Sequence, residues 1–110
     1  MTDDTVVIRK NPATLAYVFW VSGVRRGDHA ALTAEGTTLG RGRESDVLVD
    51  DPTVSEEHAR IRREGEAWYL YDLASANTTE VAGEAVFRHR LADGDRLTLG
   101  ETHLAFRVVP

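Results

Sequence analysis

Short runs of alternating apolar and polar residues dominate the chain, and turn residues interrupt the windows that are long enough for a helix. The clearest run covers residues 67–73, where Trp68 and Leu70 fall on one face of an extended strand while Tyr69 and Tyr71 fall on the other. Because both faces are partly apolar, we predict that this strand lies centrally in a sheet. The predicted strands are 16–24, 29–33, 37–41, 47–49, 58–63, 67–73, 79–82, 84–87, 95–99 and 103–109. Strands of this length and spacing predict an all-β sandwich or barrel.

Tight turns that contain a glycine indicate how the strands connect. They are the stretches REGE (63–66), VAGE (81–84), ADGD (92–95) and LGET (99–102). We therefore predict a meander of antiparallel hairpins that forms one domain over residues 14–110. Residues 1–13 are mostly polar and contain Asn11-Pro12, so we predict a flexible N-terminal tail or an added edge strand there.

The composition argues against several classes of protein. A chain of 110 residues that is 42% hydrophobic can bury one core, and because it has no cysteine, packing rather than disulfides must stabilise the fold. Eighteen acidic residues against thirteen basic ones give a net charge of -5, which opposes binding to nucleic acid or to an anionic membrane. The longest nearly apolar stretch, residues 15–24, is roughly half of what a membrane-spanning helix needs. The first residues also lack the pattern of a signal peptide, so we expect a cytoplasmic protein that does not insert into membranes.

Arg41 is the first candidate for binding chemistry, because it follows Gly40 at the end of a predicted strand. A side chain at a strand exit has a rigid base and a solvated tip. The arginine offers a planar fork of donors that suits a carboxylate or a phosphate, and its charge does not depend on pH in a cell. Taken alone, Arg41 is better explained as a solvated loop residue that pairs with Glu44 or Asp46.

Two further loops carry polar residues at the ends of predicted strands. Ser55 follows the turn Asp51-Pro52, and its hydroxyl and amide groups together can cradle an anion. His58, three residues later, can hold that loop by bonding a backbone group. Asn77 lies in the polar stretch after Leu73 and can both donate to and accept from an extended peptide, although an ordinary Asx turn is the alternative.

Catalysis, metal binding and nucleotide binding find little support in the sequence. The chain has no G-x-S-x-G elbow around a serine, and its four histidines lie on four different predicted segments. The pair of glycines at 40 and 42 lacks the rest of a nucleotide-binding motif. We therefore expect a protein that is not an enzyme and needs no metal or cofactor.

Taken in order, Gly40-Arg41, Ser55-x-x-His58 and Ser75-x-Asn77 resemble the signature of the forkhead-associated (FHA) domain family. The resemblance extends over residues 16–109, since both the opening strands and the closing hairpin are similar to those of the family. It implies an eleven-stranded antiparallel β-sandwich whose recognition loops lie at one end. It also implies that these loops bind phosphothreonine in an extended peptide.

The resemblance assigns a role to each residue of the signature. Arg41 and Ser55 would contact the phosphate, His58 would brace the recognition loops, and Asn77 would hold the peptide main chain. Gly40 and Ser75 would shape the loops. The remaining candidates for peptide contacts are Thr53, Glu56, Ala76 and Thr78.

Three of these residues depart from the family pattern. The family usually has Asn-Gly-Thr where this chain has Asn77-Thr78-Thr79, and Thr78 would be strained if its φ were positive. Ala76 lacks a hydroxyl often found before the asparagine, and Glu56 would repel a phosphate across about 6 Å. These departures leave two hypotheses open, a phosphothreonine reader and an FHA scaffold that binds its partner without phosphorylation.

The expected partner is a phosphothreonine-containing protein, such as a Ser/Thr kinase or its substrate. Thr5 lies beside Asp3 and Asp4 and has Ile8 three residues after it, a position that readers of this family often select on. It is therefore a candidate phosphosite, through which the chain could dock into its own recognition loops or into those of another copy.

Overall fold

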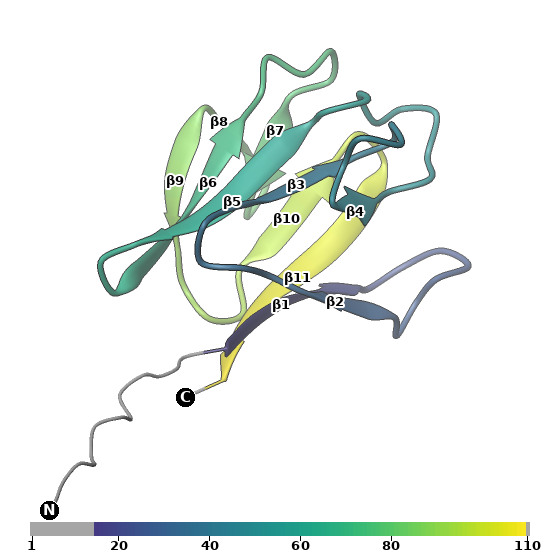
Figure 1. Ribbon diagram of the computed structural model, residues 1–110. Helices are drawn as coiled ribbons and strands as arrows, with labels where there is room; N and C mark the ends of the chain where they lie inside the picture. The colour runs from purple at the N-terminus through teal and green to yellow at the C-terminus, as the bar shows by residue number, and fades with distance from the viewer. Residues whose placement is uncertain (1–14, 110) are drawn as a thin grey trace, which may run out of the picture.

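The computed structural model describes residues 15–109, which form a sandwich of two β-sheets (Figure 1). The strands are β1 (Leu15–Trp20), β2 (His29–Ala31), β3 (Thr37–Gly40), β4 (Val47–Leu48), β5 (Ala59–Glu64), β6 (Ala67–Asp72), β7 (Thr79–Val81), β8 (Glu84–Val86), β9 (Arg88–Leu91), β10 (Arg96–Leu99) and β11 (Thr102–Val109). One sheet has the order β2-β1-β11-β10-β7-β8 and the other the order β4-β3-β5-β6-β9. The predicted all-β sandwich of eleven strands is confirmed.

Alternating side chains on the two inner faces form the core. On the five-stranded sheet Leu39, Ile61 and Leu70 are fully buried, and Leu104 and Phe106 of the six-stranded sheet are buried to the same degree. Burying a side chain of this size contributes roughly 1.5–3 kcal/mol. Because the period of two puts these residues on one face of each strand, the same pattern that forms the strands also pairs the sheets.

The structure differs from the predicted strands in three respects. It contains β9, which was not predicted because its charged residues alternate with His89 and only Leu91 is buried in the core. The first strand ends at Trp20 rather than at residue 24, since Gly23 has a φ of 79° and the chain turns there. The pairing is not wholly antiparallel, because β3 and β4 run parallel.

Other predictions about the sheets are confirmed. Strand β6 lies between β5 and β9, in the interior of its sheet as its two apolar faces suggested. The four predicted turn glycines all have a positive φ, which reaches 91° at Gly94.

The loops that follow β3, β4 and β6 gather at the upper end of the view in Figure 1, while β1 begins and β11 ends at the lower end. The loops in question, residues 41–46, 49–58 and 73–78, contain most of the predicted site residues. The predicted tail over residues 1–13 and the candidate phosphosite Thr5 lie outside the described residues. Within the described part of the chain, no helix is long and apolar enough to cross a membrane.

Candidate functional site

Arg41 leaves β3 with its backbone and the base of its side chain fixed. Its N–H donates to the Ser55 carbonyl at 2.9 Å, and its Nε donates to the Val54 carbonyl at 2.9 Å. The bond at Nε orients the guanidinium and leaves the two terminal amino groups for another acceptor. Gly40 allows this close approach, because a Cβ there would collide with the Glu56 carbonyl. The loop after β3 therefore presents an oriented cation at the surface.

Ser55 and His58 connect two of the loops. The Ser55 N–H donates to His58 Nδ1 at 3.0 Å, and His58 Nε2 lies 2.7 Å from the Thr78 carbonyl. Because Nδ1 accepts, Nε2 must carry the proton and donate. The ring is 0% exposed. The Ser55 hydroxyl accepts from the Ala76 N–H at 3.0 Å and still has its own proton to donate to a ligand.

Asp72, at the end of β6, anchors the start of the loop 73–78. Its carboxylate accepts hydrogen bonds from the Ser75 hydroxyl and N–H and from the Thr79 hydroxyl. Burial alone would raise the pKa of Asp72, but these hydrogen bonds outweigh it, so the pKa lies below its usual value. This residue was not predicted from the sequence, although a serine three positions after an aspartate is typical of a side-chain-capped turn.

Thr53 and Asn77 tie the outer part of the loops together. Asn77 Nδ2 donates to the Thr53 carbonyl at 2.8 Å. The Thr53 hydroxyl donates to Asp51 Oδ1 at 2.8 Å and accepts from the Glu101 N–H at 2.8 Å. The hydrogen bond from Thr102, followed by those from Thr53, lowers the pKa of Asp51 despite its partial burial. These bonds engage the amide of Asn77 and the hydroxyl of Thr53 within the protein.

Thr78 occupies a left-handed conformation with a φ of 63°, and Ala74 in the same loop has a φ of 57°. A β-branched residue in this region is strained by roughly 1–2 kcal/mol. The strain that sequence analysis attached to a positive φ is therefore present. Ala76 is exposed, and its N–H bonds to Ser55 as described above.

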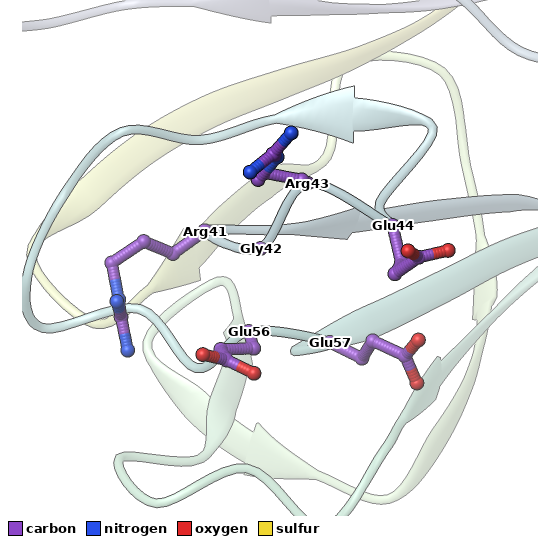
Figure 2. A pocket seen from close by; sticks show the side chains of 6 residues that line it. All are labelled: Arg41, Gly42, Arg43, Glu44, Glu56 and Glu57. Atoms are coloured by element: carbon purple, nitrogen blue, oxygen red, sulfur yellow. The ribbon is translucent and has the colours of Figure 1, made fainter.

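A cavity of about 590 Å³ opens between the loop after β3 and the residues that precede β5. It is lined by Arg41, Gly42, Arg43, Glu44, Glu56 and Glu57. Figure 2 shows that the side chains of Arg41 and Glu56 lie toward the same side, whereas Arg43 points the opposite way and Glu57 points away from Arg41. Among residues 15–109, no ion pair joins Arg41 to Glu56. An anion bound by Arg41 would therefore also experience the charge of Glu56.

A second hollow, of about 60 Å³, lies beside Thr78 and is lined by Asp72, Thr78, Ala85, Val86 and Phe87. The Phe87 side chain is 88% exposed. Phe87 was predicted at the end of the strand 84–87, without a role in binding. Its exposure beside the loop 73–78 is the only indication that Phe87 takes part in the site.

Within residues 15–109, the fold brings all the predicted loop residues to one end of the sandwich, and several of them form hydrogen bonds with one another. No group of three metal-ligating side chains occurs within residues 15–109.

The sequence model of the FHA domain family matches residues 37–100, which is more than half of the chain. The chain belongs to the FHA family. A solved structure from an analysis of phosphothreonine-dependent FHA domain interactions has a TM-score of 0.81 at 31% identity, over 87% of this chain and 98% of that one. The FHA domain of FhaA, solved as a complex with the intracellular domain of Rv3910, has a TM-score of 0.72 at 30% identity, over 84% of this chain and 99% of that one.

Curated relatives of this FHA chain include two bacterial regulators. The oxoglutarate dehydrogenase inhibitor of Corynebacterium jeikeium is 38% identical over 76% of this chain and 60% of its own length. The glycogen accumulation regulator GarA of Mycolicibacterium smegmatis is 35% identical over 90% of this chain and 63% of its own length. The chain therefore spans about three fifths of these relatives.

Proposed function

We propose that the loop end of the sandwich binds phosphothreonine in an extended peptide of a partner protein. The observation that carries the proposal is the pairing of Arg41, oriented by its Nε bond, with Ser55, whose backbone is held by His58. A phosphate dianion is best bound by an oriented guanidinium together with neutral donors, and it needs no acid, base or metal. Arg41 and Ser55 supply these two kinds of donor on adjoining backbone, since Arg41 N–H bonds to the Ser55 carbonyl.

The other predicted residues have supporting roles in this proposal. His58, Gly40 and Ser75 would hold the loops, and Asn77 would hold the peptide main chain. Thr53 would read the side chain next to the phosphothreonine, and Ala76 and Thr78 would contact the peptide. Glu56 would contact a basic residue of the peptide. The hollow beside Thr78 and Phe87 would accept a small apolar group near the phosphothreonine.

Preference for threonine over serine needs more than charge, since both phosphorylated residues carry the same phosphate. Burying the extra methyl group contributes about 0.8 kcal/mol, which is only about fourfold in affinity. Restricted rotation of the β-branched side chain would add to this, because less freedom is lost on binding.

We propose a non-catalytic adaptor in the cytoplasm, which recognises a phosphorylated Ser/Thr kinase or a substrate of such a kinase. The relatives named as an inhibitor and a regulator support a role in control rather than in catalysis. The absence of cysteine suits a reducing compartment. Docking of phosphorylated Thr5 into these loops stays a further proposal for the tail.

A second candidate function is a scaffold that binds its partner without phosphorylation. It is favoured by Glu56, whose side chain lies on the same side as Arg41 (Figure 2) and opposes a dianion there.

The experiment that separates the two is a titration with matched phosphothreonine, phosphoserine and unmodified peptides. We expect the phosphothreonine peptide to bind most tightly. Arg41→Ala should weaken its binding by about ten- to a hundredfold, because a charge-assisted bond contributes roughly 1.5–3 kcal/mol. Arg43→Ala is the matched control, since Arg43 lines the same cavity but points away. Equal affinity for all three peptides would eliminate the reader and leave the scaffold.

A further inference from the structure

The outer face of the five-stranded sheet carries two rows of arginine and tyrosine. On adjacent strands Arg60 pairs with Tyr71 and Tyr71 with Arg88, while Arg62 pairs with Tyr69 and Tyr69 with Arg90. These pairs lie on the same side of β5, β6 and β9, because the alternate residues Ile61, Leu70 and Leu91 are buried in the core. The six residues Arg60, Arg62, Tyr69, Tyr71, Arg88 and Arg90 are here called the arginine–tyrosine face.

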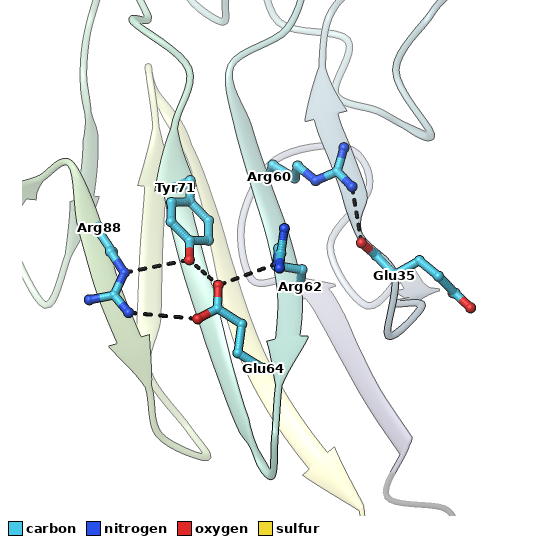
Figure 3. A network of polar contacts seen from close by, with 6 residues as sticks. All are labelled: Glu35, Arg60, Arg62, Glu64, Tyr71 and Arg88. Carbon is cyan, nitrogen blue, oxygen red and sulfur yellow. Dashed lines mark hydrogen bonds and ion pairs between the residues drawn. The ribbon is translucent and has the colours of Figure 1, made fainter.

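Positive charge is in excess on this face. Within residues 15–109, its ion pairs all involve the single carboxylate of Glu64, which lies 3.3 Å from Arg62 and 3.7 Å from Arg88. Figure 3 shows the Glu35 carboxylate pointing away from Arg60, whose guanidinium instead donates to the Glu35 carbonyl at 3.0 Å. Four guanidinium groups are thus opposed by one carboxylate, in a chain whose net charge is -5.

Several side chains of the face are held in place by one another. The Arg88 guanidinium lies 4.3 Å from the centre of the Tyr69 ring, and its Nε is 3.4 Å from the Tyr71 hydroxyl. The Tyr71 hydroxyl also donates to Glu64 (Figure 3). Groups that are already ordered lose less freedom when a ligand binds. Arginine and tyrosine are also among the residue types that contribute most to protein interfaces.

The face continues directly from the candidate recognition loops. Its first row contains Arg60 and Tyr71, each one residue from the pair Ala59 and Asp72, where two of these loops meet the sheet. The second row lies two residues further along the strands, or about 7 Å, and the arginines of one row stand about 10 Å apart across β6. A chain bound at the loops can therefore extend onto several guanidinium groups.

We propose that this face binds an acidic segment of the same partner whose phosphothreonine occupies the loops. The inference rests on the proposed function, and it adds acidic polypeptide as the chemistry that the partner must carry. The net charge of the whole chain favours a short acidic segment over nucleic acid or a membrane, because a long polyanion would also meet the acidic surfaces around the face.

The outer face of the other sheet supplies a matched control. It carries the aromatic cluster of Tyr17, Phe19 and His29, and Arg107 on this face is paired with Asp93 at 2.9 Å. Substituting Arg96 and Arg107 there removes as many positive charges as substituting Arg62 and Arg90 on the arginine–tyrosine face. Both pairs lie on exposed positions of regular strands.

The test uses phosphothreonine peptides that carry, at either end, a run of glutamates or a matched run of glutamines. A glutamate run at one of the two ends should reach the arginine–tyrosine face. For the wild type we expect that run to increase affinity about five- to tenfold over the matched glutamine run at low ionic strength, and by less as salt is added. The double variant Arg62→Gln/Arg90→Gln should lose this advantage but bind the glutamine peptide as the wild type does. The control Arg96→Gln/Arg107→Gln should retain the advantage.

Equal affinity for the two extensions, or an advantage that survives in Arg62→Gln/Arg90→Gln, would overturn the proposal. So would binding of anionic phospholipid vesicles or of duplex DNA that is tighter than binding of the glutamate peptide and depends on the same two arginines. Unphosphorylated peptides with the same extensions distinguish a failure of the proposed phosphothreonine binding from a failure of the proposed binding of an acidic segment. If phosphorylation has no effect, the proposed function fails, while the ratio of glutamate to glutamine peptides still reports on the arginine–tyrosine face.

Discussion

The two groups of loops at the recognition end are built differently. Residues 40–58 follow the FHA pattern at Gly40, Arg41, Ser55 and His58, and backbone bonds orient both candidate phosphate ligands. Residues 73–79 keep Ser75 and Asn77 but depart from the pattern at Ala76 and Thr78, and they contain two non-glycine residues with a positive φ. In the proposed function, the first group would bind the phosphate, and the second would shape the surface that meets the rest of the peptide. The comparison predicts that affinity for phosphate and choice of peptide can change separately, although His58 joins the two groups.

The largest expected effect comes from removing the anchor of the second group. Asp72→Asn keeps the size of the side chain but places an amide where Ser75 and Thr79 donate, so we expect a loss of about 2 kcal/mol in the free energy of unfolding. Urea unfolding measures this loss. Glu66→Gln, at an exposed position in the turn between β5 and β6, is the control for the loss of one negative charge. An unchanged urea midpoint for Asp72→Asn would show that the carboxylate does not hold the loop.

The pH dependence of the stability difference between the wild type and Asp72→Asn tests whether the ionised carboxylate of Asp72 causes that difference. Because the pKa of Asp72 is lowered in the folded state, its contribution to stability is present above the ordinary value of about 3.9 and is lost as the pH falls through the folded pKa. The difference in urea midpoint between wild type and Asp72→Asn should therefore narrow as the pH is lowered from about 5 to about 3. A difference that stays constant over this range would argue against an ionised Asp72 as its cause.

A smaller effect is expected within the first group of loops. Glu56→Gln removes a carboxylate about 6 Å from the proposed phosphate, and this repulsion amounts to about 1 kcal/mol in a watery environment. We therefore expect phosphothreonine peptides that lack a basic residue to bind about fivefold more tightly, with a smaller gain at high salt. Isothermal titration measures the change, and Glu57→Gln, which points away from Arg41, serves as the control. Weaker binding by Glu56→Gln would instead show that Glu56 contacts the peptide favourably.

The smallest effect concerns backbone strain in the second group. Thr78→Gly allows the φ of 63° at little steric cost and should raise the free energy of unfolding by about 0.5–1 kcal/mol, after the greater freedom of glycine in the unfolded chain is counted. Thermal unfolding measures the gain. Ala82→Gly, at a φ of 53° in the turn between β7 and β8, should give a similar gain without altering peptide binding. A destabilised Thr78→Gly would mean that the threonine side chain supports the loop.

Much of the fold could be predicted from the sequence because its determinants are local. The alternation around Trp68 and Leu70 and the glycine turns act within a few residues, so each hairpin can be identified without its neighbours. Strand β9 could not, since its extended form depends on pairing with β6 rather than on its own apolar residues. The parallel pairing of β3 and β4 likewise depends on how the loop 41–46 folds back.

For the candidate site, too, local features could be predicted from the sequence, whereas long-range contacts could not. The signature residues could be placed near strand ends in advance, and the structure gathers them at one end. The bonds from His58 to Thr78 and from Asn77 to Thr53, however, join segments that are distant in the sequence. The arginine–tyrosine face was hidden for a related reason. Its arginines look like ordinary solvated residues on each strand, and only the register of β5, β6 and β9 brings them together.

The pairing of Leu15 with Val109 has a practical consequence. The first and last described residues are neighbours at the pole opposite the recognition loops, so a fluorescent reporter or a surface tether joined beyond either residue would leave the loops facing outward. The same arrangement would let a biosensor be assembled by inserting this domain into a host protein, because the host's two attachment points need to be only one strand spacing apart.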